Sequence, residues 1–95
     1  MINFNHTSLS NQKFSSSEVS VFHFEGRNHG LPTKVKSTQV SCGCTQITHP
    51  EIIEDGFTIS LRVDKRNQSG HTYQSATIHF EDGNSVTLYV NGKIG

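Results

Sequence analysis

The sequence predicts an all-β fold, a two-sheet sandwich of about seven short strands. Three observations lead to this prediction. Apolar and polar residues alternate, most clearly in the second half of the chain. Turn-forming residues recur every ten residues or so. No window shows apolar residues at the three- and four-residue spacing of an amphipathic helix, so we expect no substantial helix.

In the first half of the chain three strands are expected. Ile2 and Phe4, with Leu9, suggest an opening strand, which the polar stretch Ser10 to Ser17 separates from the next. Val19 to Phe24 is the second strand, with its phenylalanines on one face. Thr33 to Val40 is a more polar third strand. Turn signals fall at 27–30, 55–56 and 67–70.

The second half has the clearest alternation. The segments Phe57 to Val63, Ala76 to Phe80 and Val86 to Val90 each place apolar residues at every other position, and these should form the core. His79 and Tyr89 then point outward. The segment 81–84 contains an Asp-Gly pair, which suits the positive φ of a tight turn, so the last two strands should form a hairpin.

Composition limits the classes of partner. The 95 residues fit one domain, residues 1–95, and a domain of this size has modest stability unless a partner adds buried area. Eight Lys and Arg balance eight Asp and Glu without a run of like charge, which argues against nucleic acid or a membrane surface as partner. No export signal or spanning segment is visible, so we expect a virion or cytoplasmic location, or a periplasmic one if a signal has been removed.

Cys42, Gly43 and Cys44 form the most distinctive motif, with three interpretations. In the first, both thiolates and His49 bind a metal, although zinc sites usually need a second, wider-spaced ligand pair. In the second, the thiols carry redox chemistry, which needs a nearby cation or helix terminus, and positions 41–49 offer neither. The third is structural and is favoured: one cysteine is a small buried apolar group, and Gly43 lets the chain bend out of its strand. No metal or cofactor is expected.

The residues around this motif resemble the DUF1573 family. The resemblance covers nearly the whole chain: an aromatic strand ending in Asn and Gly, the motif Ser41-Cys42-Gly43-Cys44-Thr45, an alternating strand ending in Asp64, and a closing pattern of Leu88, Val90, Gly92 and Ile94. It implies an immunoglobulin-like β-sandwich of the ASH, MSP and hydin group, without a catalytic residue set. The sequence departs from the family where Asp55 replaces a proline and where Thr33 and Thr38 replace apolar residues.

These observations favour a non-enzymatic interaction module. The sequence shows no phosphate-binding loop, nucleophile elbow or helix-borne metal motif. We expect a small accessory protein, a decoration or cement protein of an assembly such as a phage virion, with capsid or tail proteins as partners. The alternatives are a thiol- or metal-dependent protein that uses the cysteines, and a small phage-encoded regulator of a host protein. Candidate interface residues are Thr33, Val35, Thr38, Val40, Tyr73, His79 and Tyr89.

Overall fold

The computed structural model describes residues 2–48 and 52–95. These residues form nine strands and no helix, so none of the described segments is a helix that could span a membrane. The strands are β1 (Ile2–Phe4), β2 (Ser8–Phe14), β3 (Ser20–Asn28), β4 (Thr33–Val40), β5 (Thr45–Thr48), β6 (Ile52–Ile53), β7 (Gly56–Val63), β8 (Gly70–Phe80) and β9 (Ser85–Ile94).

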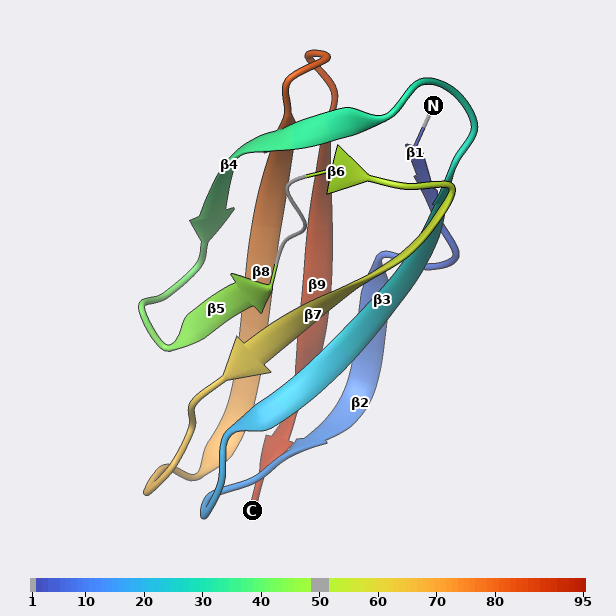
Figure 1. Cartoon of the computed structure of the whole chain (residues 1–95). Coiled ribbons are helices and arrows are strands. Elements are labelled where there is room, and N and C mark those ends of the chain that lie inside the picture. Colours follow the sequence, from blue (N-terminus) through green and yellow to red (C-terminus); the bar gives the residue numbers. More distant parts are fainter. Residues whose placement is uncertain (1, 49–51) are drawn as a thin grey trace.

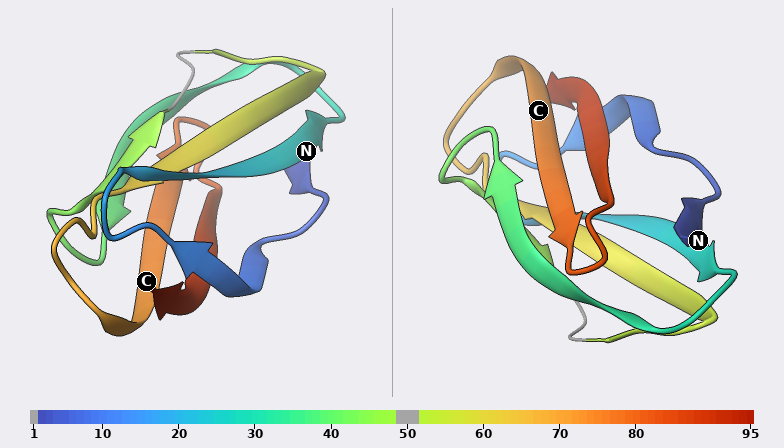
Figure 2. Two further views of the ribbon diagram at one scale, coloured as in Figure 1. Left: turned by 90° about the horizontal axis from the view of Figure 1, so that it is seen from below. Right: turned by 90° about the horizontal axis from the view of Figure 1, so that it is seen from above.

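The strands build two packed sheets. A four-stranded sheet has the order β1-β3-β7-β5, and a five-stranded sheet has the order β2-β9-β8-β4-β6. In Figure 1, β3 and β7 cross diagonally in front of the long β8–β9 hairpin, and Figure 2 shows the two layers from either end. Neighbouring strands are antiparallel except β2, which runs parallel to β9. The predicted all-β sandwich is therefore confirmed.

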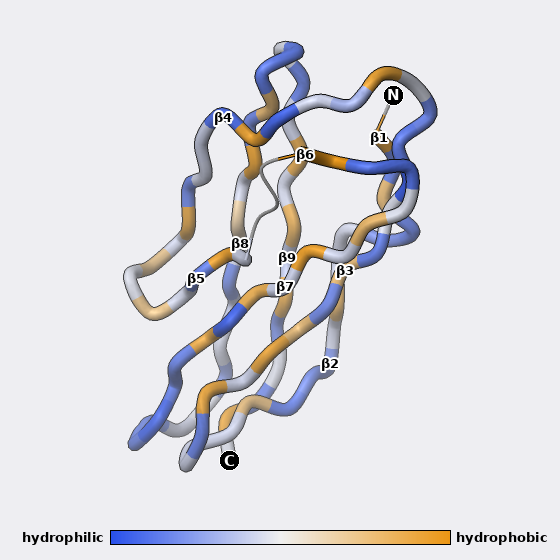
Figure 3. Tube along the Cα trace, in the orientation of Figure 1, coloured by the Kyte–Doolittle hydropathy of each residue, from blue (hydrophilic) through white to orange (hydrophobic). Residues whose placement is uncertain are grey.

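The core lies between the two sheets and is made by alternate residues of each strand, because successive side chains point to opposite faces. Figure 3 shows this alternation along β3 and β7. The ring of Phe14 lies 4.8 Å from that of Phe22 and joins β2 to β3 across the sandwich. The buried apolar residues are Phe14, Phe22, Phe24, Ile53, Ile59, Leu61, Val63, Ala76, Ile78, Phe80, Leu88, Val90 and Ile94.

Two strand predictions, one in each half of the chain, are confirmed. The strand Thr33 to Val40 has the expected bounds. The last two strands form the expected hairpin, with Gly83 at a φ of 93° in the turn. Both hairpin strands are longer than predicted, because the mostly polar residues 70–75 and 91–93 continue the main-chain ladder, which requires no apolar side chain.

One sequence prediction is wrong, and the number of strands differs from the expected one. The sequence predicts that residues 10–17 separate two strands, but Ser8–Phe14 is itself a strand that pairs with β9. Its pairing with β9 shifts register between Leu9 and Gln12, where Asn11 has a φ of 58°. The described residues form nine strands rather than about seven, because β2 and the very short β5 and β6 have no clear alternation of their own.

Candidate functional site

The cysteine turn connects the two sheets. After β4 ends at Val40, residues 41–44 carry the chain into β5 of the opposite sheet. Cys42 and Cys44 are joined by a disulfide, with Cα atoms 5.3 Å apart. Neither cysteine is fully buried, so the expectation that one serves as a small buried apolar group is wrong. The predicted departure of this segment from its strand is confirmed.

Gly43 does not need to be glycine for conformational reasons. It is absent from the residues with positive φ, and a Cβ added to it would meet no atom within 4 Å. The bend at this turn therefore does not depend on the freedom of a glycine backbone, contrary to the sequence interpretation.

A polar network fixes both ends of the turn to β8. Gln74 is only 4% exposed. Its Oε1 accepts hydrogen bonds from Ser41 Oγ at 2.9 Å and from Thr45 Oγ1 at 3.0 Å. Its Nε2 donates to Thr72 Oγ1 at 2.8 Å, so the buried amide has partners on both sides. This network holds the cysteine turn in place independently of the disulfide.

Hydrogen bonds donated by main-chain amides also hold the turn. The amide of Cys44 donates to Sγ of Cys42 at 3.2 Å. The amide of Asp64 donates to the carbonyl oxygen of Cys44 at 2.8 Å, which ties the turn to the end of β7.

An open cavity of about 450 Å³ lies beside Cys44. Its position follows from strand pairing, because Gln46 on β5 lies opposite Arg62 on β7. Two guanidinium groups therefore border a cavity that also exposes one of the bonded cysteines. The polar and sulfur-bearing residues of its lining are Cys44, Gln46, Arg62, Asp64, Arg66 and Gln68.

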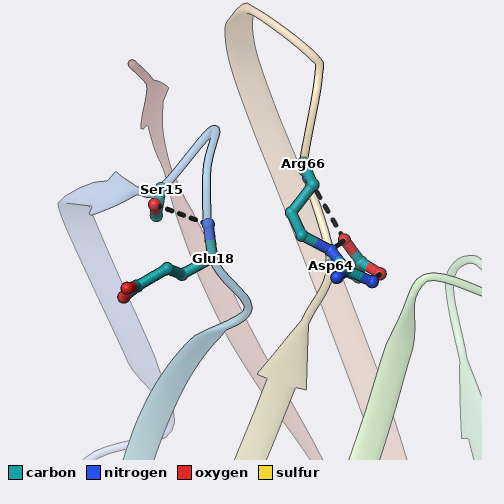
Figure 4. Close-up of polar contacts among 4 residues, drawn as sticks. All are labelled: Ser15, Glu18, Asp64 and Arg66. Carbon is teal, nitrogen blue, oxygen red and sulfur yellow. Dashed lines mark hydrogen bonds and ion pairs between the residues drawn. The ribbon is translucent and has the colours of Figure 1, made fainter.

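The two arginines of the cavity differ in their partners. Figure 4 shows Arg66 folded back on Asp64, with Nε 2.9 Å from Oδ1 and Nη2 2.7 Å from Oδ2. These hydrogen bonds lower the pKa of Asp64 to about 2, and the same carboxylate raises the pKa of Arg66. Within the part of the chain that the structure describes, no carboxylate forms an ion pair with Arg62.

The loop that carries Arg66 is held by the neighbouring loop between β2 and β3. The amide of Asn67 donates to the carbonyl oxygen of Ser16 at 2.9 Å. In that neighbouring loop Ser15 Oγ accepts the amide of Glu18 at 3.0 Å, also drawn in Figure 4. The loop that contributes Arg66 and Gln68 to the cavity is therefore held by a contact with its neighbour.

The described residues offer no ligand set for a metal ion bound by the cysteines. Among residues 2–48 and 52–95, no group of three or more His, Cys, Asp or Glu side chains is placed to hold a metal ion. The two sulfurs are bonded to each other and offer no thiolate in this state. His49, the third predicted ligand, lies outside the described residues.

A second candidate surface lies on the outside of the five-stranded sheet. Tyr73 is 58% exposed, and its ring centroid lies 5.8 Å from that of Tyr89 on the adjacent strand. Thr77 and Thr87, paired across the same two strands, have hydroxyls 2.9 Å apart. Neither strand contains an Asp or Glu. We call this surface the tyrosine face; it consists of Tyr73, Ser75, Thr77, His79, Thr87 and Tyr89.

The remaining interface candidates lie elsewhere. Val35, Thr38 and Val40 pair with core-facing residues of β8, and Thr33 pairs with the buried Ile53. These four β4 residues therefore belong to the inner side of the sheet, while Tyr73, His79 and Tyr89 lie on its outer side. The structure separates the predicted candidates into two groups.

Comparison with known proteins identifies the family. The family model described as "Protein of unknown function (DUF1573)" matches residues 2–94. The chain belongs to the DUF1573 family. No curated protein matches the chain.

A solved structure supports the fold of this DUF1573 domain. A Bacteroides ovatus GH5 xyloglucanase, determined in complex with a XXXG heptasaccharide, superposes with a TM-score of 0.67 at 10% sequence identity. The match covers 100% of this chain and 19% of that chain, so the DUF1573 domain spans about a fifth of the enzyme's length. At this identity the likeness shows the fold alone.

The arginines are the part of the site that sequence reasoning missed. Arg62 and Arg66 lie far from the cysteines along the chain, whereas residues 41–49 contain no Lys or Arg. The signal lay in the pairing of β5 with β7, which brings residues 45–48 beside residues 60–63. In this DUF1573 domain the site is therefore assembled by non-local strand pairing.

Proposed function

We propose that this DUF1573 domain is a non-enzymatic binding module that docks a protein partner on its tyrosine face. The observation that carries the proposal is the contact between the exposed Tyr73 and the half-buried Tyr89 on strands that lack carboxylates. Interfaces between proteins are enriched in tyrosine and depleted of charge at their centres. Tyrosine surrounded by small hydroxyl side chains gives a large contact area with little loss of side-chain entropy.

The edges of the five-stranded sheet are poorly suited to the addition of another strand, which favours binding through the sheet face. Between residues 35 and 40, β4 has no described strand on its outer side, but it carries Lys34 and Lys36 and a shift of register between Val35 and Ser37. Charged side chains and bulges on an edge oppose the addition of another strand. At the other edge β2 has its own bulge. A partner therefore finds fewer obstacles on the sheet face than at these edges.

Charge around the tyrosine face indicates the character of the partner. The strands of the five-stranded sheet contain four lysines and no acidic residue. Complementary charge at the rim of an interface speeds encounter and fixes orientation. We therefore expect a partner surface with an apolar centre and carboxylates around it. The lysines concerned are Lys13, Lys34, Lys36 and Lys93.

Site-specific photo-crosslinking in the native cell tests the proposal. A photoreactive residue at Ser75 stands within the tyrosine face, and one at the exposed Glu25 on β3 serves as the control on the opposite sheet. We expect a discrete cross-linked protein from position 75 that is lost in the Tyr73→Ala/Tyr89→Ala double variant. Equal cross-linking from position 25, or a product unaffected by the double variant, would contradict docking on this face.

The assembly or host protein to which the domain binds stays a prediction from the sequence. A decoration or cement protein of a phage virion, with capsid or tail proteins as partners, and a phage-encoded regulator of a host protein both agree with docking on a face. A virion component should co-purify with particles at high copy number. A regulator should instead be cross-linked to a host protein and be absent from particles.

A further inference from the structure

We infer that the Cys42–Cys44 disulfide is a thiol–disulfide exchange site that accepts electrons from a dithiol of another protein. This activity lies on the side of the sandwich that carries β5 and β7, away from the tyrosine face, and does not depend on the proposed docking. Its basis is the partial exposure of the bond, the arginines that line the same cavity as Cys44, and the hydrogen bond that Cys42 Sγ accepts.

The position of the disulfide makes it accessible to a reacting thiol and gives it little effect on stability. Both cysteines are half-buried, and Cys44 opens onto the 450 Å³ cavity. The bond links residues with a sequence separation of 2, so it removes little freedom from the unfolded chain. Exposed disulfides are typically the labile or catalytic ones, whereas structural disulfides resist reduction.

The cavity favours a thiolate over a thiol. Arg62, Asp64 and Arg66 border it, and Asp64 is held by Arg66. Two cations and one anion leave the cavity with a net positive charge. Because an adjacent cation stabilises a thiolate, an incoming thiolate is attracted to the side of the bond formed by Cys44.

The hydrogen bond within the turn assigns the leaving sulfur. The amide of Cys44 donates to Cys42 Sγ, at 3.2 Å, and such a donor stabilises negative charge that develops on that atom. A sulfur that carries a stabilised charge leaves more readily. The geometry therefore makes Cys44 the sulfur that is attacked and Cys42 the sulfur that leaves.

The exchange balances in two steps. A thiolate of the substrate dithiol forms a bond to Cys44 Sγ, and the Cys42–Cys44 bond breaks with its electron pair on Cys42, which then takes up a proton. The second thiol of the substrate loses its proton and attacks its own partner sulfur in the mixed disulfide. Cys44 is released as a thiolate in the cavity that Arg62 also lines and is then protonated. The substrate loses two electrons and two protons, and the domain gains both.

The surrounding network keeps the reduced cysteines together. Ser41 and Thr45 remain bound to Gln74, and the Cys44 carbonyl still accepts the amide of Asp64, because none of these bonds involves sulfur. The thiols therefore stay side by side after reduction, so an oxidant of the disulfide class can restore the bond.

The rate of reduction of the folded protein by dithiothreitol tests the role of the cavity. We expect Arg62→Gln to lower the second-order rate constant about three- to tenfold, with a smaller difference at high salt. Arg27→Gln removes an exposed charge from the far end of β3 and should leave the rate unchanged. Resistance of the folded protein to reduction, or equal rates for wild type and Arg62→Gln, would overturn the inference.

A monothiol probe tests which sulfur is attacked. After exposure of the folded protein to glutathione and quenching with acid, peptide mass spectrometry should place the mixed disulfide on Cys44. An adduct on Cys42 would overturn the assignment. These results are independent of the cross-linking result, so either proposal can fail alone.

Discussion

At the scale of single residues, Gly92 shows why a family pattern needs one residue type. It lies on β9 opposite Gln12, at the point where β2 changes register. A Cβ built on Gly92 would collide with the main chain of Gln12, which a change of rotamer cannot relieve. The glycine of the closing family pattern is therefore required by the close approach of the parallel strand β2.

We predict that Gly92→Ala lowers the free energy of unfolding by about 1–3 kcal/mol, because β2 must move away from β9. Urea-induced unfolding measures the change. Gly56→Ala is the matched control, since an added Cβ there meets no atom within 4 Å and its φ is not positive. Similar losses for both variants would contradict the steric explanation.

Asp64 gives the domain a defined pH dependence. Its pKa in the folded state is lowered from 3.8 to about 2 by hydrogen bonds with Arg66. A carboxyl with a lowered pKa stabilises the folded state above its unfolded pKa, and this stabilisation is lost as pH falls through the folded value. The loss should therefore occur between about pH 4 and pH 2.

We predict that Asp64→Asn reduces the dependence of stability on pH within this window. Free energies of unfolding measured at several pH values from 6 to 2 should converge for wild type and variant at the acid end. Asp82→Asn, in the exposed turn between β8 and β9, is the control. A pH dependence that survives Asp64→Asn unchanged would mean that other carboxyls determine it.

At the scale of elements, β2 and β9 place two like charges side by side. Lys13 and Lys93 are paired in the parallel ladder. Like charges at paired positions of adjacent strands are unfavourable, and opposite charges are favourable. The free energy of unfolding should therefore respond to a change of charge at Lys93, although the core stays the same.

We predict that Lys93→Glu raises the free energy of unfolding by about 0.3–1 kcal/mol at low salt. Lys93→Gln removes the repulsion without adding attraction and should give a smaller gain. Thermal unfolding of both variants at low and high salt separates the loss of repulsion from the added attraction. The explanation fails if the glutamate variant is no more stable than the glutamine variant at low salt.

The elements also show which parts of the fold a sequence can reveal. β7 and the β8–β9 hairpin were predictable, because each has one buried face and therefore alternates. β2 lies at the edge of its sheet and buries fully only Phe14, so its main-chain pairing leaves no periodic signal. β6 is two residues long, and no pattern exists over that length.

At the scale of the whole molecule, some parts of the candidate site are visible in the sequence and others depend on the fold. The cysteine motif is local and visible in the sequence, as are single tyrosines. The arginine-lined cavity and the Tyr73–Tyr89 pair depend on registers between strands. The bond between the cysteines is also a matter of geometry, because two thiols two residues apart are bonded only where the backbone brings their sulfurs together.

The source of the domain's stability leads to a last prediction. The core joins β2, β3 and β7 to the β8–β9 hairpin, and none of its members is a cysteine. For a loop as short as Cys42-Gly43-Cys44, the entropic effect of the disulfide on stability is about 1.5 kcal/mol. We therefore predict that Cys42→Ser/Cys44→Ser lowers the free energy of unfolding by no more than about this amount.

Wild-type protein unfolded by urea under reducing conditions should match this double variant, because both lack the same cross-link. A loss of more than about 3 kcal/mol, the range of disulfides that close longer loops, would instead make the bond a structural staple. A small loss of free energy of unfolding means that the two sheets stay folded when the disulfide is reduced. A domain whose fold does not depend on its disulfide can pass between the oxidised and reduced forms without unfolding, which repeated exchange requires.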